Sequence, residues 1–344
     1  MAIWLVRAGS HGEFEQKFLD DKRVYVTWDG LNTNIAKLAD RDALFETMKS
    51  TYPGAKQNRL LNWVRQVWPF AHEMRRGDLV IVPLKSEPSI WIGEITGDYQ
   101  FDAKAQDPYF HWRTVKWVGE GVPRSHFGKD LLFSFGAFLT ICRVKRNNAE
   151  ARILAMWKNK WKPETIDAVT AQVETEDDET GEAIDIEAAA RDGIARQILA
   201  QFKGHGLARL VEGILKAQGY TTYRSPEGAD GGVDILAGMG ALGFGSPKLS
   251  VEVKSQDTPI DRPTVDKLMG AMSKFGSSEG LFVSWSGFKP NVQKELAQSF
   301  FKVRLWSQKE LLEALFANYG ALDEDLKAEL PLKRIWMVAA QDEE

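Results

Sequence analysis

Residues 249–254 read Leu-Ser-Val-Glu-Val-Lys, and this alternation of apolar and polar side chains is the pattern of a β-strand. Successive side chains of a strand point to opposite faces, so Glu252 and Lys254 share one face and the two valines share the other. A second strand candidate begins near Asp234, before a glycine-rich interruption. If the two strands are neighbours in one sheet, they bring two carboxylates and a lysine together.

Two carboxylates and a lysine are the groups that a metal-dependent phosphodiesterase needs. Asp234 and Glu252 would hold Mg²⁺, for which Mn²⁺ can substitute, and the metal would activate water and neutralise charge on the phosphate. Lys254 would orient or deprotonate that water. The alternative is a solvent-facing edge strand with an incidental ion pair, because a motif this short also occurs by chance.

The sequence around this motif predicts alternating helices and strands. Apolar residues from Leu207 to Leu215 recur at the spacing of an amphipathic helix that ends at Gly219. Further helices are expected from Pro263, around 292–300 and around 311–316, with strands over 220–223, 233–236, 249–254, 280–285 and 303–306. This order predicts an α/β domain in which helices flank a mixed central sheet.

Five segments of this half resemble one family in the family's own order. They are Leu-Val-Glu-Gly-Ile-Leu-Lys-Ala-Gln-Gly-Tyr (210–220), Gly-Ala-Asp-Gly-Gly-Val-Asp-Ile (228–235), Val-Glu-Val-Lys (251–254), Leu-Phe-Val-Ser-Trp-Ser-Gly-Phe (281–288) and Leu-Trp-Ser-Gln-Lys-Glu-Leu-Leu (305–312). Residues from about 204 to 319 thus resemble the catalytic domain of Mrr restriction endonucleases, in the PD-(D/E)xK nuclease superfamily. The resemblance implies a Mg²⁺-dependent endodeoxyribonuclease, with Asp234 as the motif aspartate and Lys254 as the motif lysine.

Other acids of the motif region differ from the family pattern or have an open role. Many Mrr-like domains carry glutamine where this chain has Glu252, which is the better cation ligand. The glutamate of the family's first helix aligns with Ala208; Glu212, one turn later, could take over its catalytic role or could be a solvated helix residue. Asp230 lies in a glycine-rich turn, which suits turn formation at least as well as metal binding.

Residues 1–148 have a different character, with seven tryptophans and six short strand candidates. The strands are expected over 3–7, 24–28, 78–83, 90–95, 111–117 and 138–143, with helices over about 40–50 and 57–74. This pattern predicts a compact α+β β-barrel domain. Most of the tryptophans are expected to fill its core, but a domain that captures an extruded base needs aromatic faces, and Trp28 and Trp68 are the preferred pocket residues.

Four segments of this half also resemble a known family. They are Ile-Trp-Leu-Val-Arg-Ala-Gly (3–9), Met-Arg-Arg-Gly-Asp-Leu-Val-Ile-Val-Pro (74–83), Ile-Gly-Glu-Ile-Thr-Gly-Asp-Tyr (92–99) and Val-Pro-Arg-Ser-His-Phe (122–127). They are similar to the PUA-like domains, related to EVE and YTH modules, that precede Mrr-type domains. The resemblance implies a reader of a modified base without identifying that base. Arg7, Lys85 and Arg124 are candidate phosphate contacts, although a single surface cation is more often only solvated.

Composition excludes several other classes of protein. The single cysteine, Cys142, rules out an internal disulfide and a cysteine-cluster zinc site, and the five histidines have no metal-ligand spacing. No Walker-type phosphate loop is present. No apolar run approaches the ~20 residues of a membrane helix, and the N-terminus lacks the features of a signal peptide. We therefore expect a cytoplasmic protein without a membrane partner.

The net charge of −4 is unexpected for a DNA-binding protein, but its distribution explains it. Residues 174–187 contain eight acids and no lysine or arginine, so the remaining residues carry a net charge of +4. The simplest interpretation of this segment is a disordered, solvated linker. A sharper hypothesis is that it mimics DNA and shields a basic face until DNA displaces it.

These observations predict the organisation and function of the chain. We expect a reader domain over 1–148, a helix and acidic linker over 149–191, a nuclease domain over 192–320 and a charged tail over 321–344 that forms an extra strand or a dimer contact. The predicted function is a modification-dependent, type IV-like restriction endonuclease acting on double-stranded DNA as a homodimer, since one site cuts one strand. The alternatives are a DNA-repair or RNA-processing nuclease of the same fold, or a non-catalytic nucleic-acid-binding protein.

Overall fold

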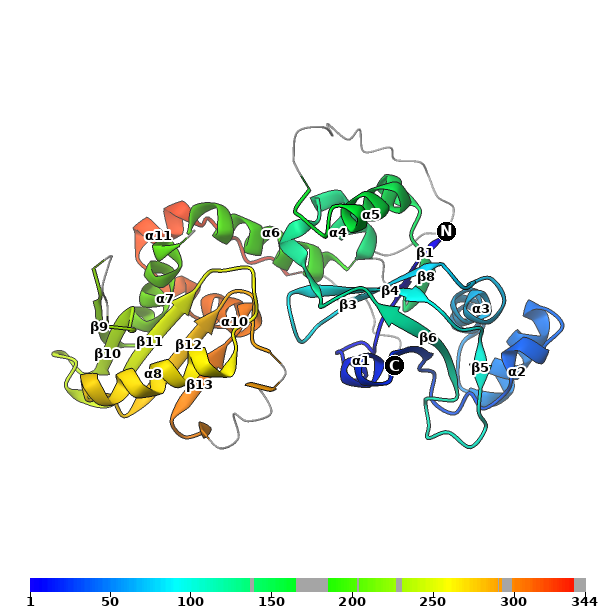
Figure 1. Ribbon diagram of the computed structural model, residues 1–344, viewed down its shortest axis with the longest axis horizontal. Helices are drawn as coiled ribbons and strands as arrows, with labels where there is room; N and C mark the ends of the chain where they lie inside the picture. Colours follow the sequence, from blue (N-terminus) through cyan, green and yellow to red (C-terminus); the bar gives the residue numbers. More distant parts are fainter. Residues whose placement is uncertain are drawn as a thin grey trace. The chain divides into compact units, whose positions relative to one another are not determined.

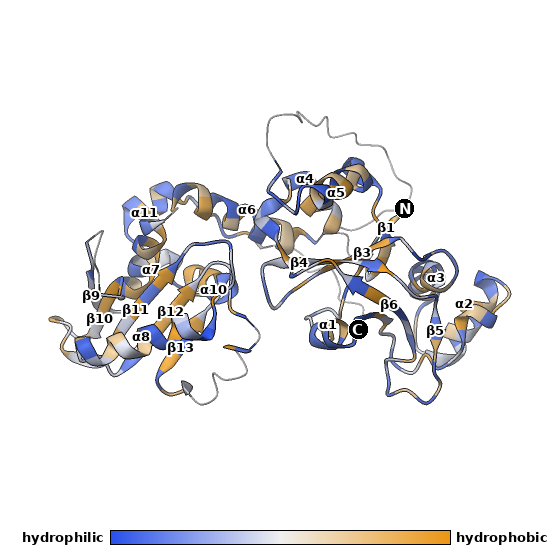
Figure 2. Ribbon diagram, in the orientation of Figure 1, coloured by the Kyte–Doolittle hydropathy of each residue, from blue (hydrophilic) through white to orange (hydrophobic). Residues whose placement is uncertain are grey.

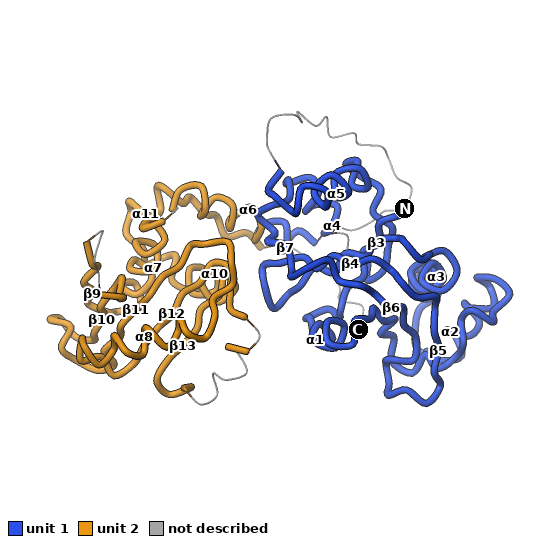
Figure 3. The backbone as a smooth tube through the Cα atoms, viewed as in Figure 1, with its two compact units in different colours: residues 1–190, 339–344 blue, residues 191–338 orange. Residues whose placement is uncertain are grey.

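The computed structural model divides into two compact units, one within Met1–Ala190 and one within Arg191–Val338 (Figures 1 and 3). Helix α6 (Ile186–Gln201) begins in the first unit and continues in the second. Hydrophobic residues follow the strands of both sheets (Figure 2). The residues that the structure describes are 1–136, 139–164, 185–202, 204–226, 231–289, 291–292 and 299–336.

The first unit is built on a curled mixed sheet in the order β2-β6-β4-β3-β1-β8. Its strands are β1 (Ile3–Val6), β2 (Arg23–Val26), β3 (Leu79–Pro83), β4 (Ser89–Ile95), β6 (His111–Trp117) and β8 (Ile141–Arg143), with the short β5 (Gln100–Phe101) and β7 (Val122–Pro123) on β6 and β4. Only β1 and β3 are parallel. Among the described strands, β2 and β8 each pair on one side only, so the sheet is a half-barrel and the expectation of a closed barrel is corrected.

Helices cover both faces of this half-barrel. They are α1 (Glu15–Asp21), α2 (Arg41–Thr51), α3 (Gln57–His72), α4 (Lys129–Phe135) and α5 (Ala149–Lys158). Alternation along β1 sends Trp4 and Val6 into the core that α1, α2 and α3 cover, and Ile3 and Leu5 into the core that α4 and α5 cover. The seven tryptophans of residues 1–148 all lie in or against the first of these cores, as expected for most of them, whereas Trp157 and Trp161 pack against the second.

The second unit contains a five-stranded mixed sheet in the order β13-β12-β11-β10-β9. The strands are β9 (Tyr220–Arg224), β10 (Ile235–Met239), β11 (Gly245–Lys254), β12 (Glu279–Ser284) and β13 (Val303–Trp306). β11, β12 and β13 are parallel, whereas β10 is antiparallel to both β9 and β11. The expected mixed sheet is therefore confirmed, and β11 lies at its centre.

Helices α7 (His205–Ala217) and α10 (Gln308–Asn318) cover one face of this sheet, and α8 (Arg262–Phe275) covers the other (Figure 1). Val251 and Leu281 belong to the core with α7 and α10, and Phe282 belongs to the core with α8. The described tail contains helix α11 (Glu324–Glu329), and residues 331–336 form no strand, which corrects the extra-strand alternative. Residues 165–184 of the acidic linker, and 293–298 of the helix expected around 292–300, lie outside the described residues.

A buried polar chain fixes the segment after β2. The backbone N–H of Ile35 donates to the Tyr99 hydroxyl at 3.1 Å, and that hydroxyl lies 2.7 Å from Nδ1 of His111. Nε2 of His111 lies 2.6 Å from the carbonyl oxygen of Leu31. Because a carbonyl oxygen can only accept, Nε2 of the fully buried, neutral imidazole carries the proton, and Nδ1 accepts from the Tyr99 hydroxyl.

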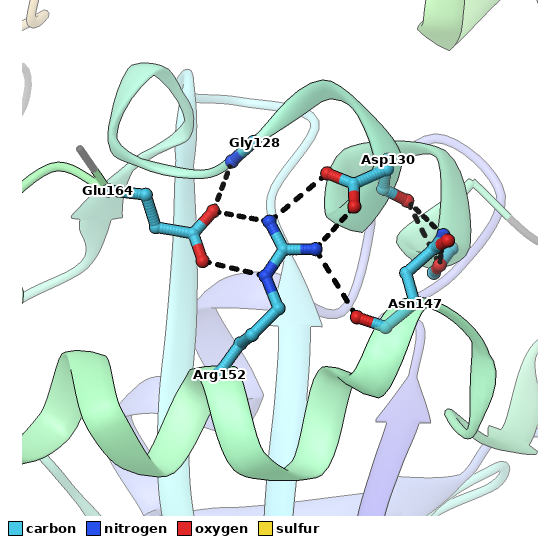
Figure 4. A network of polar contacts seen from close by, with 6 residues as sticks. Gly128, Asp130, Asn147, Arg152 and Glu164 are labelled. Atoms are coloured by element: carbon cyan, nitrogen blue, oxygen red, sulfur yellow. Dashed lines mark hydrogen bonds and ion pairs between the residues drawn. The ribbon is translucent and has the colours of Figure 1, made fainter. Parts of the chain in front are cut away.

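A second polar network ties the end of α5 to the start of α4 (Figure 4). The Arg152 guanidinium binds both oxygens of Glu164, at 2.8 and 2.6 Å, and also binds the Asp130 carboxylate. Glu164 in addition accepts from the backbone N–H of Gly128 at 2.8 Å, and the Asn147 carbonyl accepts from Arg152 at 3.2 Å. Three segments that are far apart in sequence are therefore held by one cation.

The histidine chain predicts acid sensitivity. Burial lowers the pKa of His111 to about 4 from an ordinary value of 6.5, so the native state holds the neutral ring. The stability that this ring contributes is complete above pH 6.5 and is lost as the pH falls toward 4. We expect the wild-type protein to lose about 2 kcal/mol of unfolding free energy between pH 7 and pH 5 beyond the loss of His111→Gln, measured by urea denaturation. Equal losses in both proteins would contradict this assignment.

The arginine network predicts a large effect of one substitution. Replacing Arg152 by Met leaves two partly buried carboxylates without their cation, and we expect a loss of about 3 kcal/mol of unfolding free energy. The matched control is Arg143→Met, because Arg143 pairs with Glu150 at 2.8 Å on a more exposed surface, where such a pair contributes at most about 1 kcal/mol. Urea denaturation should show a larger loss of unfolding free energy for Arg152→Met than for Arg143→Met. Similar losses would show that the Arg152 network stabilises the protein no more than an exposed ion pair does.

Candidate active site

The pairing of β10 with β11 brings Asp234, which directly precedes β10, beside Glu252. The antiparallel ladder has Ile235 across from Val251, and Asp234 directly precedes it. The backbone N–H of Asp234 donates to the Val251 carbonyl at 2.9 Å, and the Asp234 carboxylate oxygen Oδ2 accepts from the N–H of Val253 at 2.7 Å. Asp234 is therefore bonded to the residues before and after Glu252, which brings the two acids close together at the start of β10.

Glu252 and Lys254 lie together on the face that α7 does not cover. Val251 and Val253 belong to the core under α7, so the alternation predicted from the sequence is confirmed. Nζ of Lys254 forms an ion pair with Oε1 of Glu252, whose side chain is 11% exposed, whereas that of Lys254 is 36% exposed. Because β11 is the central strand of the sheet, the edge-strand alternative is wrong.

The donor set of this site suits a hard divalent cation. Asp234 and Glu252 offer carboxylate oxygens, and Mg²⁺ is usually bound by one or two carboxylates with water and substrate phosphate completing its octahedron. Within the described part of the chain, no group of three or more histidine, cysteine, aspartate or glutamate side chains has the geometry to hold a metal. A cation at this site would therefore depend on water and phosphate oxygens. Asp230 lies outside the described residues.

Glu212 contacts β9 and does not lie beside the Glu252–Lys254 ion pair. It is a buried residue of α7, and its carboxylate accepts from the Thr222 hydroxyl at 2.9 Å and pairs with Lys216 at 2.9 Å and Arg224 at 3.5 Å. Thr222 and Arg224 belong to β9 and are opposite Ala237 and Ile235, which face α7. The pleat thus places Glu212 on the face away from the ion pair of β11, and its catalytic role stays a prediction.

The structure adds a polar position that the sequence analysis did not single out. Ser284, at the end of β12, is fully buried and lies opposite Lys254 in the parallel register. Its hydroxyl donates to the carbonyl of Gly287 at 2.8 Å, and the N–H of Trp285 donates to the carbonyl of Lys254 at 2.9 Å. These bonds fix the loops that follow the two strands. A lone serine in the apolar run 280–285 was the available sequence signal.

Trp28, one of the two predicted pocket residues, follows β2. Continuing the β2–β6 register by two residues places it opposite Tyr109. The N–H of Gly30 donates to the Asp107 carboxylate at 2.9 Å, so the two segments remain side by side beyond the strands. Trp28 is partly buried against the core, which leaves part of the indole accessible.

Trp68, the other predicted pocket residue, has different surroundings in α3. Its indole stacks on the His72 imidazole, with ring centroids 3.7 Å apart and planes 15° from parallel. Nε2 of His72 lies 3.2 Å from the carbonyl oxygen of Ile35. This stack and its packing against the core account for the position of Trp68 without a ligand.

The three candidate phosphate contacts come from separate segments that converge. The Arg7 guanidinium donates to the carbonyl of Phe135 at 3.3 Å, and its charge interacts with that of Arg124. The N–H of Arg124 donates to the carbonyl of Pro88 at 3.0 Å, in the loop that also carries Lys85. A cationic cluster therefore exists in the first unit, and we refer to Arg7, Lys85 and Arg124 as the cationic cluster.

Comparison with known families gives one match in each of the two compact units. Residues 199–315 match the Mrr_cat family, described as restriction endonuclease, and residues 4–129 match a domain of unknown function, DUF8426. The second unit therefore contains a restriction endonuclease domain of the Mrr_cat type. A restriction endonuclease domain is a DNA endonuclease, as the sequence predicted.

Three solved structures show distant similarity. The DNA modification-dependent restriction endonuclease AspBHI is 14% identical, with 80% of this chain and 73% of that chain covered and a TM-score of 0.33. The MspJI restriction endonuclease, solved in complex with a 27-mer oligonucleotide, is 16% identical over 81% and 70% of the two chains, with a TM-score of 0.28. A protein of unknown function, AF1548, is 17% identical over 38% and 78%, with a TM-score of 0.25.

One further comparison found no relative, and the structure shows no candidate membrane helix among its described residues. The search of curated proteins gave no significant match. In the part of the chain that the structure describes, no helix has the length and apolar character needed to cross a bilayer. Neither result changes the assignment of the nuclease domain.

The hydrogen bond from Val253 to Asp234 predicts a difference between two substitutions. In Asp234→Asn the amide oxygen can still accept from the N–H of Val253, whereas Asp234→Ala leaves that N–H without its acceptor. We expect the alanine protein to be about 1–2 kcal/mol less stable than the asparagine protein, measured by urea denaturation without metal. Equal stability of the two variants would show that the hydrogen bond from Val253 to the Asp234 side chain does not contribute to stability.

Proposed function

We propose that the protein is a modification-dependent restriction endonuclease, with a reader in the first unit and a Mg²⁺-dependent phosphodiesterase site in the second. The observation that carries the catalytic half is the pair of hydrogen bonds that join Asp234 to Val251 and Val253, the two neighbours of Glu252, in a restriction endonuclease domain. Their partner Lys254 completes the set of groups that hydrolysis of a phosphodiester needs.

The site residues have distinct roles in this proposal. Asp234 and Glu252 would hold Mg²⁺, which when bound neutralises charge on the phosphate and makes water a better nucleophile. Lys254 is half-exposed, so its ammonium group can reach the attacking water or a phosphate oxygen while Glu252 limits its rotation. The N–H of Trp285 donates to the Lys254 carbonyl, which holds the end of β11 beside β12 and supports a fixed position of Lys254 next to Glu252.

The reader half of the proposal rests on the aromatic residues of the first unit. An extruded base is held by stacking on aromatic faces and by hydrogen bonds to its edge. Trp28 is opposite Tyr109 beyond the ladder and is only partly buried, so it suits this role better than Trp68, whose face is covered by His72. The proposal names a modified base as the ligand and leaves its identity to experiment.

Double-strand cleavage requires two sites. Each chain has one Asp234–Glu252–Lys254 site, and one such site cuts one strand. We therefore propose that two molecules act together on a duplex, either as a homodimer or after meeting on DNA. A duplex nicked in one strand by dilute protein and broken in both strands at higher protein concentration would support this arrangement.

Cleavage of matched duplexes tests the function. We expect cutting in Mg²⁺ or Mn²⁺ of only one duplex among those carrying plain cytosine, 5-methylcytosine, 5-hydroxymethylcytosine or N6-methyladenine. Lys254→Ala should lower the cutting rate at least about 100-fold with binding retained, because the ammonium group acts mainly in the transition state. Trp28→Ala should reduce the preference for the modified duplex.

The possible results separate the two halves of the proposal. Equal cutting of all duplexes would keep the nuclease and remove the reader. Binding without cutting of any duplex would remove the nuclease activity from the proposal. Loss of binding in Lys254→Ala would make this residue a phosphate contact instead of a group that acts on the water.

A further inference from the structure

The cationic cluster of the first unit has a resident acidic partner. Oδ2 of Asp185 lies 3.4 Å from Nζ of Lys85, and the Asp185 side chain is only 15% exposed. Burial lowers the pKa of Arg7, the neighbouring charge of Arg124 lowers it further, and the Asp185 carboxylate is the strongest influence in the opposite direction. Asp185 therefore pairs with Lys85, and its charge favours the charged form of Arg7.

Backbone contacts show that Asp185 is held at this place. Its N–H donates to the carbonyl of Gly136 at 2.9 Å, next to Phe135, whose carbonyl accepts from Arg7. Its other carboxylate oxygen, Oδ1, accepts from the N–H of Ala188 at 2.8 Å, in the first turn of α6. The residue thus caps a helix and faces the cationic cluster at the same time.

Asp185 also has a particular place in the sequence. It is the seventh of the eight acids in residues 174–187, a run without lysine or arginine. The remainder of the chain carries a net charge of +4, so this run contains the negative charge that makes the whole chain acidic. A carboxylate oxygen and a phosphate oxygen make the same type of contact with lysine and arginine.

We propose that the cationic cluster is a binding site for a DNA phosphate, and that Asp185 occupies it when DNA is absent, so that the Asp185 carboxylate competes with the DNA backbone. This inference rests on the proposed function and adds a form of regulation to it. The competitor is part of the same chain, so its effective concentration is high and independent of protein concentration. DNA must displace Asp185 before it reaches Lys85 and Arg7.

The strength of the contact suits a competitor that DNA can displace. The Lys85 side chain is 38% exposed, and partly exposed ion pairs of this length contribute little to stability. A duplex offers many phosphates at once, whereas Asp185 offers one carboxylate at this cluster. Asp185 at the cationic cluster therefore weakens the binding of any duplex by a modest and constant factor.

The test is the affinity of the full-length protein for a plain, unmodified duplex, measured by fluorescence anisotropy in EDTA. Asp185→Asn removes the charge and keeps a good helix-capping side chain. We expect its affinity to be about threefold to fivefold higher than that of the wild type at low salt. Because salt screens the Asp185–Lys85 pair, this ratio should approach one as the salt concentration rises.

Asp40→Asn is the matched control. Asp40 is an exposed residue of the same unit that caps α2, where its carboxylate accepts from the N–H of Ala43 at 2.8 Å. The substitution therefore changes the net charge and a capping residue in the same way, away from the cationic cluster. We expect its affinity for DNA to change by less than that of Asp185→Asn.

A double-mutant cycle with Lys85→Met shows whether Asp185 acts through the cationic cluster. In the Lys85→Met background, Asp185→Asn should have a smaller effect than in the wild type. An equal effect in both backgrounds, equal effects of Asp185→Asn and Asp40→Asn, or weaker binding by Asp185→Asn would overturn the inference while the proposed function stands. Absence of DNA binding by every variant would overturn the proposed function as well.

Discussion

The pairing of β10 with β11 is the interaction on which the nuclease site depends. A shift of one residue between these strands would move Glu252 to the other face and separate it from Asp234. Two features prevent the shift. Val251 and Val253 are buried against α7, and the Asp234 carboxylate accepts from the backbone N–H of Val253. The apolar face therefore holds the register, and the register in turn positions the polar face for chemistry.

Local pattern predicted most of the second unit. Alternation over 249–254 identified the face of Glu252, and apolar spacing from Leu207 to Leu215 identified α7. The position of Glu212 was beyond this type of inference. Periodicity shows which side of a helix is buried, but not which face of the sheet the helix covers, and here it covers the face away from Glu252.

The first unit shows where sequence patterns stop being informative. Six of its eight strands were predicted with bounds that differ by at most three residues, whereas the two-residue strands β5 and β7 are too short to give a sequence pattern and were not predicted. The half-barrel form depends on which strands pair, and no local pattern specifies that. The Arg152 network and the contact of Asp185 with Lys85 join residues up to 100 positions apart, so each of these residues alone had the sequence signature of an ordinary surface charge.

The distribution of charge has a consequence for specificity. Phosphate contacts supply most of the affinity of a protein for any DNA, whereas contacts with a base supply discrimination. A chain that occupies part of its own phosphate-binding surface with a carboxylate weakens its phosphate contacts and leaves its contacts with the base unchanged. For a restriction endonuclease domain in a cell whose own DNA is in large excess, the weaker non-specific contribution lowers the fraction of protein held on DNA that lacks the target base. The net negative charge of the chain is then compatible with DNA cleavage, because Asp185, one of the acids that make the chain negative, acts on the same phosphate contacts that DNA uses.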